Sequence, residues 1–285
     1  MTSMRVTFDT NALDLACRPE RFPKDPRQPH LHEVRDALKD GKLKGFFPVT
    51  MLTLEGIQKT DRATVFSGTK LRKVDEKTGV AKNADLPEEI RRRVGGRDIP
   101  KIDVGLQVEQ PDRKPLHPEV LARVAAARAL GLRILRAPPR VAMFDLTDPD
   151  GSYYEPIDKA NLPLWQSRVS QVLRAIEARG VGGAQVKALG IALGVTSPEK
   201  VWFAALDQAK DVHEKRAVER AFSEWADGDA LATHIAYGIE VFCSADVGNS
   251  NSTHSVLDAP NRSWLTQTYG VQFMTFDDLL ASLAM

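Results

Sequence analysis

Short apolar segments alternate with longer segments of helical periodicity along most of this chain. Apolar residues recur at every second position in the short segments, and at every third or fourth position in the longer ones. This pattern predicts strands at Met4–Asp9, Lys44–Val49, Ile102–Val108, Leu132–Leu135, Val141–Phe144, Glu240–Ser244 and Gly270–Met274. It predicts helices at His32–Lys39, Pro118–Leu130, Leu162–Ala178, Ser197–Trp225, Asp229–Tyr237 and Asn261–Tyr269.

Local signals mark where several of these elements begin and end. Thr50 is expected to cap a helix that carries Glu55, and Thr275 is expected to cap the last helix. The segment from Asp61 to Gly96 is polar, basic and poorly periodic, so it is expected to be a long loop. Thr10–Leu13 reads as a turn, and the proline-rich stretch Pro19–Pro29 as a loop.

Strands that alternate with helices predict an α/β fold, here a three-layer α/β/α arrangement with a mainly parallel central sheet. The chain has 285 residues, enough for one large domain with a substantial core. We expect the core to comprise residues 1–60 and 221–285, with residues 61–220 as a partly helical insertion that binds substrate or a partner.

Charge is distributed unevenly although the formal net charge is only +1. Between Asp61 and Lys101 there are 11 Lys and Arg against 7 Asp and Glu, a net of +4. Residues 221–285 contain one basic residue, Arg262, against 8 acids, a net of −7. The basic part could meet phosphate groups, although a solvated surface is an equally good interpretation.

Several classes of protein are disfavoured by the sequence. It contains no apolar run long enough to span a bilayer and no basic-then-apolar leader at its start. The two cysteines, Cys17 and Cys243, do not have metal-ligand spacing, and a cytoplasmic location is expected. The glycine-rich stretch near Gly182 does not match a dinucleotide-binding fingerprint.

Four acids occupy corresponding places at the ends of predicted elements. Asp9 and Asp246 end strands, Glu55 follows a strand, and Asp229 or Asp227 opens the helix before Asp246. In parallel sheets these positions converge on the crevice beyond the carboxyl ends of the strands. Clustered carboxylates stay ionised only beside a cation, and oxygen ligands suit Mg²⁺ or Mn²⁺. Each acid alone is also a good cap or turn residue, so the hypothesis depends on their joint occurrence.

The motifs that carry these acids resemble those of the PIN domain family of metal-dependent nucleases. They are DTNAL from Asp9, PVTMLTLEG with Glu55, DALATHIAYG from Asp229, FCSAD ending at Asp246, and the terminal GVQFMTFDDLLASL. The resemblance implies that Asp9, Glu55, Asp229 and Asp246 form an acidic metal site with Asn11 and Ser244 as supporting polar groups. Asp227 competes with Asp229 for the third position.

The function expected from this resemblance is hydrolysis of phosphodiester bonds, of RNA rather than DNA, by in-line attack of a metal-activated water. Asp9, Asp229 and Asp246 would hold the ion, and Glu55 would orient the water. Basic residues of the insertion would hold the nucleic-acid backbone; they include Lys70, Arg72, Lys73, Arg91, Arg92 and Arg93. The alternatives are an inactive module that binds RNA or protein, and the toxin of a toxin–antitoxin pair. A homodimer and an antitoxin or other protein partner also stay open.

Overall fold

The computed structural model describes residues 3–86, 88–109, 115–137, 148, 150–194, 202–245 and 254–283. Its strands are β1 (Met4–Phe8), β2 (Leu43–Pro48), β3 (Lys70–Ala81), β4 (Ile99–Glu109), β5 (Arg133–Leu135), β6 (Val241–Cys243) and β7 (Gln272–Met274). Its α-helices are α1 (Thr10–Cys17), α2 (Gln28–Lys39), α3 (Lys59–Ser67), α4 (Glu88–Val94), α5 (Pro118–Ala129), α6 (Leu162–Ala178), α7 (Gly183–Ala192), α8 (Val212–Ala236), α9 (Ala259–Tyr269) and α10 (Phe276–Leu283). Short 3₁₀ segments include η2 (Val49–Met51) and η4 (Trp202–Gln208).

A five-stranded sheet forms the centre of the molecule, with the order β5-β2-β1-β6-β7. Each neighbouring pair in this sheet runs parallel. The α/β fold with a mainly parallel sheet, predicted from the alternation of strands and helices, is therefore confirmed. Since all these strands point the same way, the loops that follow β1, β2 and β6 lie at one edge of the sheet.

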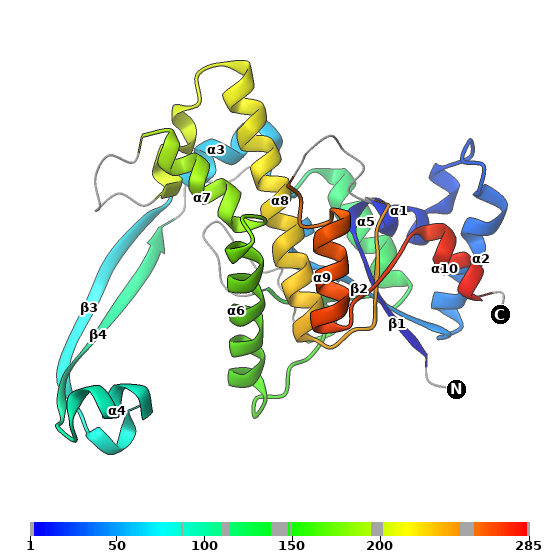
Figure 1. The fold of residues 1–285 in the computed structure, drawn as a ribbon. Coiled ribbons are helices and arrows are strands. Elements are labelled where there is room, and N and C mark those ends of the chain that lie inside the picture. The colour runs from blue at the N-terminus through cyan, green and yellow to red at the C-terminus, as the bar shows by residue number, and fades with distance from the viewer. Residues whose placement is uncertain are drawn as a thin grey trace.

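Helices cover both faces of this sheet, because successive side chains along each strand point to opposite faces. Val6 and Phe8 of β1 pack into one core together with α1, α2, α5 and α10. Phe242 of β6 packs on the other face with α6, α8 and α9. Figure 1 shows these two groups of helices on opposite sides of β1 and β2. The result is the expected three-layer arrangement.

The span 61–220 contributes to the core as well as extending from it. β5 pairs with β2 in the central sheet, and Val124 and Ala127 of α5 belong to the main core. α6 covers the opposite face of the sheet. The sheet therefore takes a strand from inside this span, and the core extends beyond residues 1–60 and 221–285.

The prediction of a long loop from Asp61 to Gly96 was wrong. This stretch contains α3, then β3, which pairs antiparallel with β4 along the whole of both strands, and then α4. Figure 1 shows this hairpin extending away from the sheet with α4 at its far end. β3 lacks a clear apolar alternation because both faces of the hairpin are largely in solvent, with Val80 and its neighbour Gly79 both exposed. The strand predicted at Ile102–Val108 is confirmed as part of β4.

The helix boundaries also differ from the prediction around Asp227 and Asp229. Instead of two helices, one helix, α8, runs through both residues from Val212. It begins at Asp211, whose side chain accepts hydrogen bonds from the backbone N–H groups of His213 and Glu214. Neither Asp227 nor Asp229 is therefore a helix cap.

Three shorter predictions need correction. Thr50 does not start an α-helix, because the chain forms the 3₁₀ turn η2 and then further turns through Glu55. Thr10–Leu13 is the first turn of α1, and α2 begins at Gln28. The expected strand Val141–Phe144 lies outside the described residues, as do residues 197–201 of the expected helix Ser197–Trp225.

Several predictions are confirmed closely, including helices α5, α6 and α9 and the short strands β5, β6 and β7. Thr275 precedes the last helix, and its side chain accepts a hydrogen bond from the backbone N–H of Asp278. Across the part of the chain that the structure describes, no helix is both long enough and apolar enough to cross a bilayer.

Candidate functional site

Asp9 lies where β1 ends and α1 begins, at the carboxyl edge of the sheet. Its backbone N–H donates to the carbonyl of Cys243 in the neighbouring strand β6. Its Oδ1 accepts from the backbone N–H of Thr10 at 2.7 Å, so the carboxylate caps the N-terminus of α1. The positive end of the helix favours the ionised form at this position. Only 8% of Asp9 is exposed.

Two polar side chains hold the second oxygen of the Asp9 carboxylate. Ser244, directly after β6, donates its hydroxyl to Oδ2 at 2.7 Å, and Asn11 of α1 donates to the same oxygen at 3.0 Å. Asn11 is fixed in turn, because its Oδ1 accepts from the backbone N–H of Ala245 at 2.8 Å. The structure thus brings Ser244 to Asp9 from a distant part of the chain, while Asn11 lies only two residues after Asp9.

Thr10 links Glu55 to Asp9, although the sequence did not point to Thr10 as a site residue. The hydroxyl of Thr10 donates to Glu55 Oε2 at 2.5 Å. Burial raises the pKa of Glu55, and the nearby negative charge of Asp9 raises it further. The pair therefore shows the mutual repulsion expected of two carboxylates that share one site.

An open hollow of about 450 Å³ lies over these groups. That size is typical of sites that bind small molecules or a unit of a longer chain. The hollow is lined by Asp9, Thr10, Asn11, Asp14, Phe22, Glu55, Arg123, Ser223 and Asp227. It therefore combines carboxylates, one aromatic ring and one guanidinium group.

The two competing acids of α8 occupy different environments. Asp227 lines the hollow together with Ser223, one helical turn earlier. Asp229 is only 1% exposed and is not among the residues that line it. Two residues along an α-helix differ by about 200° around its axis, so both cannot face the same side. The hollow therefore contains Asp227 and not Asp229.

Arg123 of α5 is the cation at this hollow, and the sequence analysis did not identify it. It donates to Asp14 at 2.8 Å, and Arg18 also pairs with Asp14. Burial alone would raise the pKa of Asp14, but the hydrogen bonds from these two guanidinium groups hold it below its usual value. Nothing in the sequence near Arg123 suggests a site, because only the packing of α5 on α1 brings it there.

Three further residues proposed for substrate binding lie elsewhere. Arg91, Arg92 and Arg93 are on α4, at the far end of the hairpin from the sheet (Figure 1). Arg92 pairs with Glu88 of the same helix. The structure does not bring these arginines to Asp9. Asp246 lies outside the described residues.

The donor chemistry at the hollow fits a hard cation in part. Asp9 and Glu55 provide oxygen ligands of the type that Mg²⁺ and Mn²⁺ prefer, and a cation between them would relieve their repulsion. Within the described residues, however, no group of three or more His, Cys, Asp or Glu side chains is arranged to hold a metal. A complete ligand set would therefore need a further group, such as Asp246.

Comparisons with protein-family models, with curated proteins and with solved structures give no match to this chain. The resemblance to the PIN domain family, drawn from the short motifs around the acids, therefore stays a prediction.

Proposed function

We propose that this protein is a metal-dependent nuclease that hydrolyses phosphodiester bonds, with RNA as its expected substrate. The observation that supports this most directly is the pairing of Asp9 and Glu55. Asp9 is held by Ser244 and Asn11, and Glu55 has a raised pKa in the same open hollow. Fixed carboxylates that repel each other are typical of catalytic sites rather than of structural ion pairs.

Each group at the hollow has a role in this proposal. Asp9, Asp227 and Asp246 would hold Mg²⁺ or Mn²⁺, an ion that lowers the pKa of bound water and neutralises phosphate charge. Glu55, with its raised pKa, would accept a proton from the attacking water. Arg123 would contact a phosphate oxygen, and the ring of Phe22 would stack on an unpaired base.

Replacement of Asp9 by Asn tests the site. Asn is also a good helix cap, so Asp9→Asn should fold. Cleavage of RNA in Mn²⁺ should fall by roughly a hundredfold or more, the scale expected when a charge-stabilising group is removed. Asp246→Asn should behave in the same way. The matched control is Asp36→Asn on α2, an exposed acid with a surface ion pair. Undiminished cleavage by folded Asp9→Asn would remove the site assignment.

The acid that α8 contributes is tested by separate variants. Because Asp227 lines the hollow, Asp227→Asn should lose Mn²⁺-dependent cleavage and keep its thermal stability. Asp229 is buried, so Asp229→Asn should lower the melting temperature while the folded protein still cleaves. The reverse pattern would assign the role to Asp229, as the family resemblance implies.

A module that binds nucleic acid without cleaving it is the second candidate. It is favoured by the lack of a three-group metal set among the described residues. A screen of single-stranded and structured RNA and DNA with purified protein in Mg²⁺ and Mn²⁺ separates the two. Binding without cleavage in every condition would favour the second candidate.

A further inference from the structure

A second, smaller pocket lies at the carboxyl ends of β6 and β7. Its walls are formed by Phe242, Ser244, Arg262, Phe273, Met274, Thr275 and Asp278. Its volume is about 40 Å³. One water molecule needs roughly 10–15 Å³ of such space, so the pocket can hold a few waters or a group of similar size. It is too small for a nucleobase.

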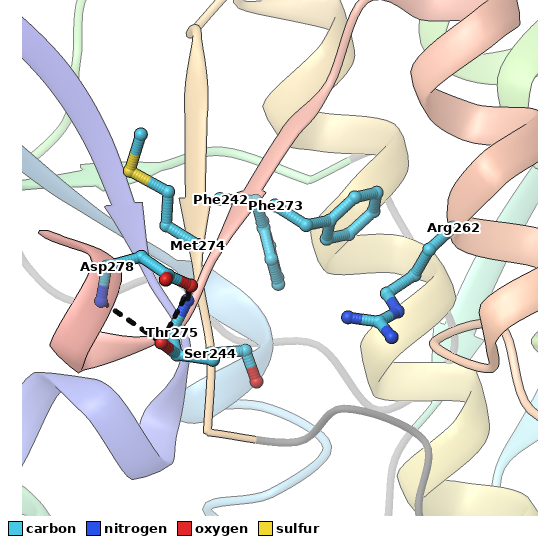
Figure 2. A pocket seen from close by; sticks show the side chains of 7 residues that line it. All are labelled: Phe242, Ser244, Arg262, Phe273, Met274, Thr275 and Asp278. Atoms are coloured by element: carbon cyan, nitrogen blue, oxygen red, sulfur yellow. Dashed lines mark hydrogen bonds between the residues drawn. The ribbon is translucent and has the colours of Figure 1, made fainter.

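Arg262 of α9 supplies the positive charge of this pocket. Figure 2 shows its guanidinium group directed from α9 toward the pocket interior. Its Nε is buried and has no hydrogen-bond acceptor, and no ion pair of its side chain is found among the described residues. It is also the only Lys or Arg between residues 221 and 285. A partly buried cation without a partner is unfavourable, and an anion would relieve this.

Asp278 does not neutralise Arg262, although both line the pocket. The Asp278 carboxylate accepts hydrogen bonds from the backbone N–H of Thr275 at 2.9 Å and from its hydroxyl at 2.7 Å. These two bonds lower the pKa of Asp278 and hold it at the start of α10. Figure 2 shows Asp278 and Arg262 on opposite walls of the pocket. The guanidinium group therefore stays available to a ligand.

Ser244 connects this pocket with the Asp9 hollow. It lines the pocket, and its hydroxyl lies 2.7 Å from Asp9 Oδ2. The pocket and the hollow are thus next to each other along the carboxyl edge of the sheet. A group bound by Arg262 would lie beside the groups that surround Asp9.

We propose that the Arg262 pocket is a phosphate-binding subsite. Arg262 binds two oxygens of one phosphate through its guanidinium group, the geometry that this side chain favours. The apolar walls of Phe242 and Phe273 strengthen this contact by excluding water. The identity of this phosphate rests on the proposed function. The phosphate belongs to a nucleic-acid strand whose adjacent phosphodiester lies at Asp9.

The test follows the Nε–H signal of Arg262 in ¹H–¹⁵N spectra of the full chain. The signal is assigned by its loss in Arg262→Gln, with Arg174→Gln, an exposed arginine of α6, as the matched control. Titration with inorganic phosphate should shift the Arg262 signal in a saturable way, whereas sodium chloride at equal ionic strength should not. A signal that does not move, or moves equally with chloride, overturns the proposal.

Single-stranded oligonucleotides identify the source of the phosphate. Binding of 5′-phosphorylated and 5′-hydroxyl forms is compared in wild type, Arg262→Gln and Arg262→Lys. A several-fold loss restricted to the phosphorylated form indicates a terminal phosphate, and an equal loss for both indicates the backbone. Partial rescue by Lys supports a role for the charge. No loss with either form overturns the proposed source.

These experiments distinguish failure of the phosphate subsite from failure of the proposed nuclease activity. A phosphate-dependent shift in a protein that cleaves nothing would keep the subsite and remove the nuclease. Cleavage by a protein whose Arg262 signal ignores phosphate would keep the nuclease and remove the subsite.

Discussion

The carboxyl group of Glu55 lies in the hollow in surroundings that disfavour its negative charge. Because its pKa is raised above the ordinary value of 4.5, its favourable contribution to stability is complete below that pH and is lost as pH rises through the folded-state pKa. At neutral pH the Glu55 carboxyl therefore opposes folding, because it must either keep its charge while buried or take up a proton. Sites that carry such strain commonly become more stable when the strained group is removed.

Glu55→Gln should consequently unfold at a higher urea concentration than wild type at neutral pH without metal. The amide oxygen can still accept the hydrogen bond from Thr10, so the local contacts survive. The gain should disappear below the ordinary Glu pKa, where both side chains are neutral. Excess Mn²⁺ should stabilise wild type more than the variant. An equal or lower midpoint for the variant at neutral pH would contradict this account.

His234 is a second residue whose ionisation makes the free energy of unfolding depend on pH. It is fully buried, and its Nδ1 lies 2.8 Å from the hydroxyl of Thr7. Burial, together with the charge of Arg5, lowers its pKa from 6.5 to about 3. The imidazole is therefore neutral in the fold, but it gains a proton in the unfolded chain below pH 6.5. Its contribution to stability is present above that pH and falls as the pH approaches 3.

His234→Gln should flatten this dependence. The wild-type free energy of unfolding should decline by up to about 1.4 kcal/mol per pH unit from this residue across the window. In the variant that slope should be absent, so the two stability curves should converge as pH falls. Urea unfolding across the window measures both curves. Curves that stay parallel would show that His234 does not titrate as stated.

At the element scale, close backbone contacts position the helices around α8. α7 packs on α8 and on the 3₁₀ segment η4, and Gly190 makes the second contact possible. A Cβ at Gly190 would lie 2.2 Å from the backbone oxygen of Trp202. Trp202 in turn packs its ring against Trp225 of α8. This cluster holds the N-terminal half of the helix that carries Asp227.

Gly190→Ala should therefore destabilise the protein by about 1–3 kcal/mol, the usual range for overpacking. The better helix propensity of Ala recovers about 1 kcal/mol at most, which is less than a forced backbone shift. The matched control is Gly79→Ala on β3, where a new Cβ would meet nothing within 4 Å. Thermal unfolding of both variants checks this. A Gly190→Ala protein as stable as the Gly79→Ala control would contradict the packing argument.

Sequence patterns predict elements well where one face is buried and poorly where none is. β1 and β6 were predictable because Val6, Phe8 and Phe242 alternate with residues of the opposite face. β3 was missed because its side chains, such as Val80, face solvent, whereas its partner β4 was predicted in part, as the strand Ile102–Val108. The position of Asp9 at the end of β1 followed from the predicted topology. Thr10 and Arg123 could not be predicted, because their roles depend on how α1 packs against neighbouring segments.

At the scale of the whole molecule, the hairpin is an arm attached to a compact core. None of its described residues from 70 to 109 belongs to the buried core. Val104 lies opposite Glu76 and Ile102 opposite Thr78 in the ladder, so these side chains share one face. Ion pairs such as Lys101–Asp103 lie on the other face. The tip, α4, carries Arg91, Arg92 and Arg93.

Replacing residues 71–108 by a short glycine-containing turn should leave the core folded, with nearly unchanged thermal stability. RNA binding should become weaker and less dependent on salt, because the logarithmic salt slope falls by about 0.9 for each lost phosphate contact. Glutamine at Arg91, Arg92 and Arg93 in the full chain should reproduce the smaller slope. Filter binding over a range of salt concentrations measures it. An unchanged slope in both proteins would exclude the arm from nucleic-acid binding.

The register of the hairpin pairs Lys70 with Glu109, so the arm leaves and rejoins the rest of the chain at a single point. Insertions or deletions in the hairpin therefore need to preserve only this one junction with the core. Evolution can lengthen, shorten or exchange the hairpin while the carboxyl edge of the sheet keeps its geometry. An engineer can use the same junction to graft a reporter or an affinity tag.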